Sequence, residues 1–193
     1  MRALSVAADL LFLNLLTILC SVPVVTAGAA LSALCDIVQH IVRGEETYIV
    51  RSFFRSFRSN LWKGSLLGLI FLSAAVLIWL DYRAASAYIP ELRFAAAAVG
   101  VIALAAALYA FALQARYENS IGGTLKNAVS LMIAYFPRTL GMLICTLGMW
   151  LIALHFVRYA LPVLIMFGIS LPCYVCALLY NGIFEKLEKK EDI

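Results

Sequence analysis

Cys173 and Cys176 form the one Cys-x-x-Cys pair in the sequence, which is the spacing of a redox dithiol or of half a zinc site. A structural zinc ion needs four ligands, and no second pair and no nearby histidine completes the set. The pair also falls inside a long apolar stretch, where a free cysteine behaves as a small hydrophobic residue. We therefore expect both thiols to pack inside a helical core.

Other catalytic patterns are missing from the sequence. It contains no glycine-rich phosphate loop, no G-x-S-x-G nucleophile elbow and no H-E-x-x-H zinc motif. The only histidines are His40 and His155, and no serine or cysteine nucleophile comes with an identifiable base and orienting partner. We predict a protein that is not an enzyme, with no catalytic or metal-binding residues and no cofactor.

The composition is that of a membrane protein. Hydrophobic residues make up 64% of 193 residues and charged residues 13%, with a mean hydropathy of +0.96; soluble domains average about 45–50% and about 25%. Five stretches without charge approach or exceed the roughly 20 residues that cross a bilayer; they are 10–35, 64–80, 94–115, 139–157 and 159–184. The predicted fold is all-α, a polytopic helical membrane protein.

We place one transmembrane domain over residues 1–193. Its five spans are expected at 4–23, 64–81, 94–115, 139–157 and 159–183, with short amphipathic interfacial helices at 26–42, 47–61 and 125–136. Asp9 inside the first apolar run argues against a cleaved signal peptide. Six spans stay open, with 4–22 and 24–42 as a hairpin; Asp36 disfavours this, because a charge at span depth costs about 2.5–3.5 kcal/mol or more.

Lysine and arginine define the orientation. With five spans, eleven of these residues fall on one side and four on the other, and positive residues stay cytoplasmic. The C-terminus and the loops 43–63 and 116–138 are therefore expected inside, and the loop 81–93 outside. The same pattern argues against a nucleic-acid ligand, because the basic residues sit at span ends.

The segment 43–63 is the most patterned one outside the spans. Arg51, Arg55 and Arg58 line one helical face. A second face is apolar, and it consists of Val50, Phe53, Phe54, Phe57 and Leu61. Such a helix suits the interface, where arginines meet anionic lipid. The alternative is a docking surface for a cytoplasmic protein.

The segment 116–138 repeats this arrangement. The glycine pair 122–123 is expected to end one helix, with Thr124 as the N-cap of the next and Pro137 closing that helix. Arg116 and Glu118 lie at the mouth of a span. They are either one half of an ion pair with a neighbouring helix or ordinary solvated loop charges.

The first apolar run is interrupted at Pro23, which must end a helix because it has no N–H and a fixed φ. The hydroxyl of Thr26 can support the lost backbone pairing, and Gly28 lets a second helix approach closely. The glycines of "GSLLG" at 64–68 offer a similar close-contact face. Asn14, with Thr17 and Ser21, forms a polar stripe that either bonds to another helix or lines a wet path.

Three blocks of the sequence resemble the YesL-like family of small bacterial membrane proteins. They are "ADLLFLNLLTILCSVPVVTAGAALSAL", "RGEETYIVRSFFRSFRSN" and "ARYENSIGGTLKNAVSLMIAYFPRTL". The family has no assigned function, so the resemblance implies a multi-pass protein of the bacterial plasma membrane and carries over no catalytic residue. Its genes often lie beside carbohydrate-uptake ABC transporter and sensor genes, which implies an accessory role in sugar uptake.

We therefore expect a non-enzymatic accessory protein whose partners are membrane lipid and an ABC permease, its ATPase or a sensor kinase. The alternative is an oligomeric channel or transporter for a small solute, with the polar stripe facing a pore. The candidate docking residues are Arg51, Phe53, Phe54, Arg55, Phe57, Arg58, Arg116, Glu118, Asn119 and Lys126. The candidate residues for the span break and helix packing are Asn14, Pro23, Thr26 and Gly28.

Overall fold

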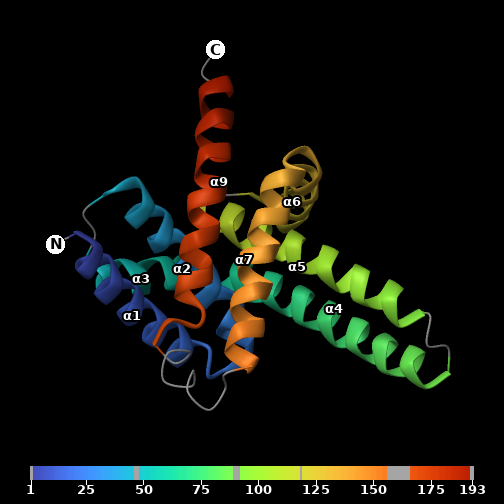
Figure 1. Ribbon diagram of the computed structural model, residues 1–193. Helices are drawn as coiled ribbons and strands as arrows, with labels where there is room; N and C mark the ends of the chain where they lie inside the picture. The colour runs from blue at the N-terminus through green and yellow to red at the C-terminus, as the bar shows by residue number, and fades with distance from the viewer. Residues whose placement is uncertain (1, 46–47, 89–91, 118, 156–165, 192–193) are drawn as a thin grey trace.

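The computed structural model describes the chain except residues 1, 46–47, 89–91, 118, 156–165 and 192–193. All regular structure in the described part is helical, which confirms the predicted all-α class (Figure 1). The elements are α1 Arg2–Cys20, the 3₁₀ turn η1 Val24–Thr26, α2 Ala27–Arg43, α3 Ile49–Ser59, α4 Leu61–Tyr88, α5 Leu92–Arg116, α6 Ile121–Ala134, α7 Phe136–His155 and α9 Ser170–Glu191.

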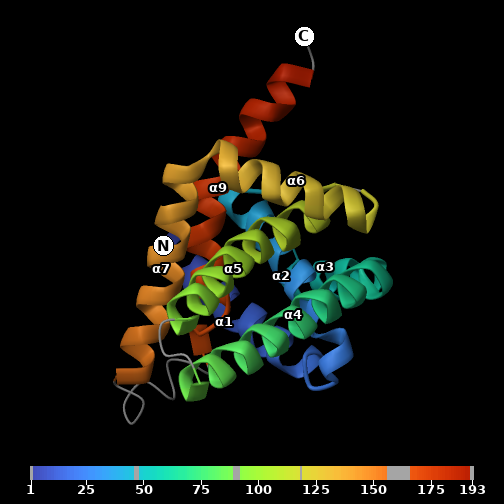
Figure 2. The ribbon, with the colours of Figure 1, turned by 90° about the vertical axis from the view of Figure 1, so that its right-hand side faces the viewer.

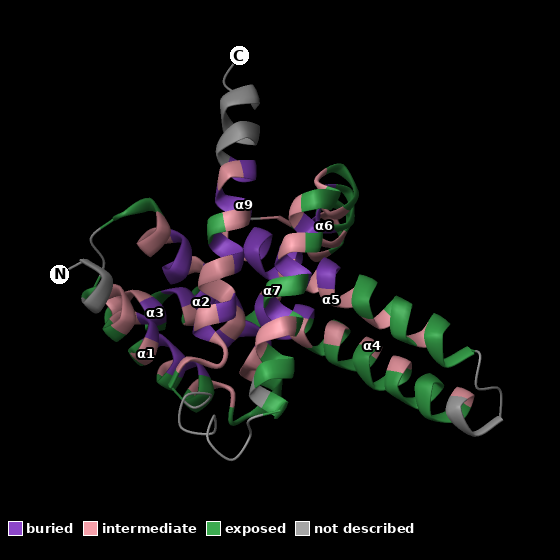
Figure 3. Ribbon diagram, in the orientation of Figure 1, coloured by how far each residue is buried: buried purple, intermediate pink, exposed green. Residues whose placement is uncertain are grey.

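Helix α2 is the centre of the fold. It contacts α1, α3, α4, α5 and α9, and most of its length is buried (Figure 3). Its predicted position at 26–42 matches the observed helix, which ends at Gly44 in the left-handed conformation, φ 74°. Its enclosure inside the protein is not what an interfacial helix would show, and the segment Val24–Arg43 is itself long and apolar enough to cross a membrane.

Among the described residues, three helices meet the length and composition of a membrane span: Val24–Arg43, Leu61–Ala85 and Leu92–Arg116. The bent pair Ile121–Ala134 and Phe136–Ile152 supplies a fourth if it counts as one span. Shorter apolar helices cover Ser5–Cys20 and Ser170–Phe184. The chain is thus an all-α protein with three to four candidate spans, and the number five stays a prediction.

A bend of 100° separates α6 from α7 (Figure 2). It falls at Tyr135, two residues before Pro137, which lies in the first turn of α7 where the missing N–H costs nothing. The predicted start of α6 is wrong. Ser120 is the N-cap, and its hydroxyl accepts the N–H of Gly123 at 3.2 Å, while glycines 122–123 and Thr124 lie inside the helix. Ser120 has the extended backbone of an N-cap, so α6 begins before the glycine pair. The glycines therefore do not separate two helices.

Helices α4 and α5 form a hairpin that extends away from the rest of the molecule (Figures 1 and 2). Only its inner end is enclosed, where α5 is buried from Ala105 to Gln114. Along its outer part most side chains are exposed, and they are apolar on every side of both helices (Figure 3). A helix that is apolar all round belongs inside a protein core or in lipid, and no other described helix covers this part.

Candidate functional site

The basic face of α3, which we define as Arg51, Arg55 and Arg58, is fully on the surface. The opposite side of the helix is held against α1 and α2, because Phe53 has no exposed surface and stacks on Phe57 with ring centres 6.3 Å apart. The three guanidinium groups are therefore carried by a helix whose position is fixed by aromatic packing. This makes a firm positive surface rather than a flexible loop.

The apolar face predicted for this helix divides into two parts. Phe53 is buried and Phe57 half-buried, but Val50 and Phe54 are 51% and 46% exposed. The hydrophobic stripe is wider than the line along which α3 meets α1 and α2, so its edge points outward. Phe54 thus lies beside the arginines as an exposed aromatic group.

Three polar side chains meet where α3 ends, and we call this set the polar junction: Asn60 at the C-cap of α3, Gln114 of α5 and Thr124 of α6. Gln114 Nε2 donates to Asn60 Oδ1 at 3.5 Å, and Thr124 Oγ1 lies 3.5 Å from Gln114 Oε1. Both Gln114 and Thr124 are buried, so water cannot reach their polar atoms. The two long contacts therefore provide the hydrogen-bond partners that these buried groups need. The junction ties the end of α3 and the start of α4 to α5 and α6.

The predicted docking residues of the segment 116–138 are dispersed around this junction. Arg116 is turned inward, donates from Nη1 to Asn181 Oδ1 at 3.1 Å, and lies over the ring of Phe184 at 5.2 Å. The carbonyl of Asn119 accepts from Lys63 Nζ at 3.3 Å, and Lys126 is exposed on α6. Glu118 lies outside the described residues. Arg116 is thus a link between α5 and α9 rather than part of the exposed basic surface.

Asn14 joins the first helix to the last. Its Oδ1 accepts the N–H groups of Ile169 and Ser170 at 2.9 and 3.0 Å, so a side chain of α1 caps the N-terminus of α9. Asn14 is completely buried, as is Thr17, whose hydroxyl donates to the carbonyl of Leu13 at 2.7 Å. Of the two readings of the polar stripe, bonding to another helix describes Asn14.

The break after α1 is closed by a single hydroxyl. Thr26 Oγ1 lies 2.7 Å from the carbonyl oxygen of Cys20 and 2.8 Å from that of Pro23. The hydroxyl therefore donates to the carbonyl of Cys20, which the end of α1 leaves without a helical partner; the carbonyl of Pro23 also accepts the N–H of Thr26 at 2.9 Å. This is the arrangement expected for Thr26 from the sequence.

The small residues after the break and the glycines of α4 meet each other. A Cβ added to Gly28 would lie 2.1 Å from the carbonyl oxygen of Gly64 and 2.7 Å from the Cα of Gly68. The two helix backbones are thus in direct contact, which only glycine allows at these positions. The sequence predicted a close-contact face on each segment but did not predict that they pair.

The thiols predicted to pack do lie in the core. Cys35 Sγ and Cys173 Sγ are 3.5 Å apart, and Cys176 Sγ is 3.4 Å from the hydroxyl of Thr146. They line an apolar cavity of about 200 Å³ between α2, α5, α7 and α9. In the described part of the chain no three His, Cys, Asp or Glu side chains are grouped so that they would hold a metal ion.

A charged cluster at the end of α2 was not foreseen. His40 contacts the carboxylates of Asp36, at 3.5 Å, and of Glu45, and Arg43 Nε lies 3.1 Å from Glu45 Oε1. The hydrogen bond from His40 is the largest cause that lowers the pKa of Glu45 below its usual value; burial opposes it, and the charge of Arg43 adds to the lowering. The sequence could have predicted this cluster, because four charged or titratable residues lie within the short segment 36–45.

Two buried amide side chains link helices in ways that the sequence did not predict. Gln39 Nε2 donates to the carbonyl of Ala112 at 3.2 Å, and Asn181 receives Arg116. Asn181 is an isolated amide in an apolar stretch, whereas Gln39 stands between Asp36 and His40; either amide must find a partner when it is buried. That pattern is visible in the sequence, although the partner is not.

These features define a class of protein: an all-α chain with several helices apolar enough to cross a membrane, a buried network of amide and hydroxyl groups, and one exposed basic helix face. Residues 10–82 match the model of a protein family described as of unknown function, DUF624. The match covers most of α1, the break, α2, α3 and most of α4. No curated protein and no solved structure gave a match.

Proposed function

We propose that this chain is a non-enzymatic accessory component of a bacterial carbohydrate-uptake ABC transporter, which it contacts through the basic face of α3. The observation that carries the proposal is the position of Arg51, Arg55 and Arg58, exposed together on a helix anchored by Phe53. The eleven-to-four distribution of lysine and arginine supports a cytoplasmic location for this face. The resemblance to the YesL-like family supports the choice of partner: the permease, its ATPase or a sensor kinase.

The chemistry of the face indicates an acidic partner surface. Guanidinium groups form bidentate pairs with carboxylates, and arginine is enriched at protein interfaces. Exposed pairs contribute only about 0.2–1 kcal/mol each, so three arginines alone give orientation and a faster encounter more than tight binding. The exposed ring of Phe54 beside them adds an apolar contact.

The test is co-purification of transporter components from native membranes in a mild detergent. Replacing all three arginines by glutamate should abolish recovery of the partner. Replacing all three by lysine keeps the charge and should retain most of it, because α3 is held by Phe53 and not by the arginines. Absence of any sugar-uptake component with the unaltered protein contradicts the choice of partner, and full recovery with the glutamate variant contradicts the choice of surface.

The alternative of an oligomeric channel loses its main support. That alternative needs the polar stripe to face a pore, but Asn14 and Thr17 have no exposed surface within the single chain. No feature of the described residues favours a pore over the accessory role.

A further inference from the structure

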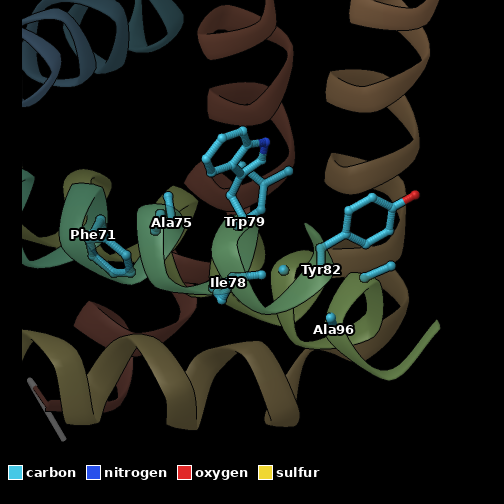
Figure 4. Close-up of a pocket in the computed structure, with 11 residues that line it drawn as sticks. Phe71, Ala75, Ile78, Trp79, Tyr82 and Ala96 are labelled. Atoms are coloured by element: carbon cyan, nitrogen blue, oxygen red, sulfur yellow. The ribbon is translucent and has the colours of Figure 1, made fainter. Parts of the chain in front are cut away.

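A groove of about 480 Å³ runs along the α4–α5 hairpin (Figure 4). One wall follows α4 at spacings of four, three and four residues, and it consists of Phe71, Ala75, Ile78 and Tyr82. The facing wall follows α5 between residues 96 and 107: Ala96, Gly100, Ala103 and Ala107 repeat the same spacings, and Ala97 and Leu104 also line it. The side chain of Trp79 also lines the groove.

The groove exists because the two walls do not match in size. Where α4 presents aromatic and branched side chains, α5 presents Ala96 and Ala103, which do not fill the space opposite. At Gly100 the side chain of Ile78 approaches to 3.5 Å from the position a Cβ would take. Trp79, Tyr82 and Ala97 are exposed, so the groove is reached from the side of the hairpin. In a helix pair that is apolar all round, that side is the hydrocarbon of the membrane.

The length of the groove matches one leaflet. Residues 71–82 of α4 rise about 16 Å, at 1.5 Å per residue. Half of a hydrocarbon core of about 30 Å is about 15 Å. A groove of this length accommodates the part of a lipid chain that lies on one side of the bilayer.

One end of the groove carries a positive charge. The guanidinium carbon of Arg83 lies 5.1 Å from the centre of the Trp79 ring, so the charge stands directly over a side chain that lines the groove. Tryptophan and tyrosine prefer the headgroup level of a membrane, which places Trp79 and Tyr82 at the leaflet surface. The other described charges of this end are Asp81 and Arg93, and Arg93 lies over Phe94, which does not line the groove.

We propose that the groove binds one acyl chain of an anionic phospholipid, whose phosphate pairs with Arg83. The charge at one end of the groove favours an anionic lipid over a helix of a second copy, because a second copy would bring another Arg83 to the same level of the membrane. The small-residue wall therefore forms the floor of a lipid site rather than a helix-packing face.

Trp79 provides the measurement. In a variant in which Trp62 and Trp150 are replaced by phenylalanine, the fluorescence of Trp79 reports contact with lipid chains. The protein is reconstituted into phosphatidylcholine vesicles that contain a minor fraction of brominated phosphatidylglycerol or, separately, of brominated phosphatidylcholine. We expect the brominated phosphatidylglycerol to quench more strongly at equal bromine content.

Matched variants identify the site. Ala97→Phe fills the groove and should remove the difference between the two lipids, whereas Ala98→Phe, on an equally exposed neighbour outside the groove, should leave it intact. Arg83→Gln should weaken the preference about fivefold, because one arginine near an anionic surface contributes about 1 kcal/mol. Arg93→Gln removes the same charge from the same end and should have little effect.

Three outcomes overturn the proposal. Equal quenching by the two lipids in the unaltered groove shows that no anionic lipid is selected. A preference that survives Ala97→Phe shows that the lipid binds elsewhere. Efficient disulfide cross-linking of an Ala97→Cys variant into dimers, with no lipid preference, shows that a second copy occupies the groove.

Discussion

The contact between α2 and α4 leads to a sharp prediction for Gly28→Ala. The added methyl group would stand 2.1 Å from the carbonyl oxygen of Gly64 and 2.7 Å from the Cα of Gly68. Both atoms belong to a helix backbone, so no side chain can turn away and the two helices must move apart. Overpacking of this kind costs about 1–3 kcal/mol, occasionally more, and backbone against backbone belongs at the upper end. We expect a loss of about 3 kcal/mol in the free energy of unfolding.

The assay is equilibrium unfolding in mixed detergent micelles, followed by circular dichroism. Gly148→Ala in α7 is the control, because a Cβ there meets nothing within 4 Å. That substitution should stabilise the helix by about 0.5–1 kcal/mol, since alanine has the higher helix propensity. The two variants therefore move in opposite directions. A Gly28→Ala protein within 0.5 kcal/mol of the unaltered one, on the scale of surface substitutions, would refute the direct backbone contact.

Three further changes test other contacts, each by the same unfolding assay. Asn14→Ala removes the cap of α9 and should cost about 1–2 kcal/mol; an unchanged midpoint would mean that Asn14 does not hold that helix. Phe53→Ala should cost about 3–5 kcal/mol, whereas Phe54→Ala, at an exposed position, should cost far less, and equal losses would contradict the packing of α3. Because the pKa of Glu45 is lowered in the folded state, the stabilisation by this carboxylate is present above its usual pKa and is lost as the pH falls through the lowered one. Glu45→Gln should therefore be slightly less stable at pH 7 and indistinguishable once the pH lies below the lowered pKa of Glu45; a difference that persists in stronger acid would contradict this.

Local elements could be predicted from the sequence because their signals are local. Pro23 predicts the end of α1, the spacing of Phe53 and Phe57 predicts a helix, and the residue before Pro137 predicts a boundary. The cap of α6 was missed because glycine is permissive and does not by itself end a helix, while Ser120 supplied the stronger capping group.

Contacts between distant segments could not be predicted in the same way. Asn14 and the N-terminus of α9 lie 155 residues apart along the chain, and no pattern near Asn14 says which helix it caps. Likewise, Gly28 and Gly64 each predict a close approach but not that they approach each other. Helix α2 looked interfacial because Asp36 and His40 stand in its second half, but these two residues contact each other at 3.5 Å while the other faces are buried.

The glycine crossing of α2 and α4 also has a mechanical consequence. From Gly68 to the end of α4 at Tyr88 the helix rises about 30 Å, and its main described neighbours there are α5 and, near the crossing, η1. At the crossing the backbones of Gly28, Gly64 and Gly68 are in direct contact. A tilt of about 5° there displaces the far end by about 2.6 Å over a 30 Å arm. Gly28, Gly64 and Gly68 thus form the point about which the α4–α5 hairpin can tilt.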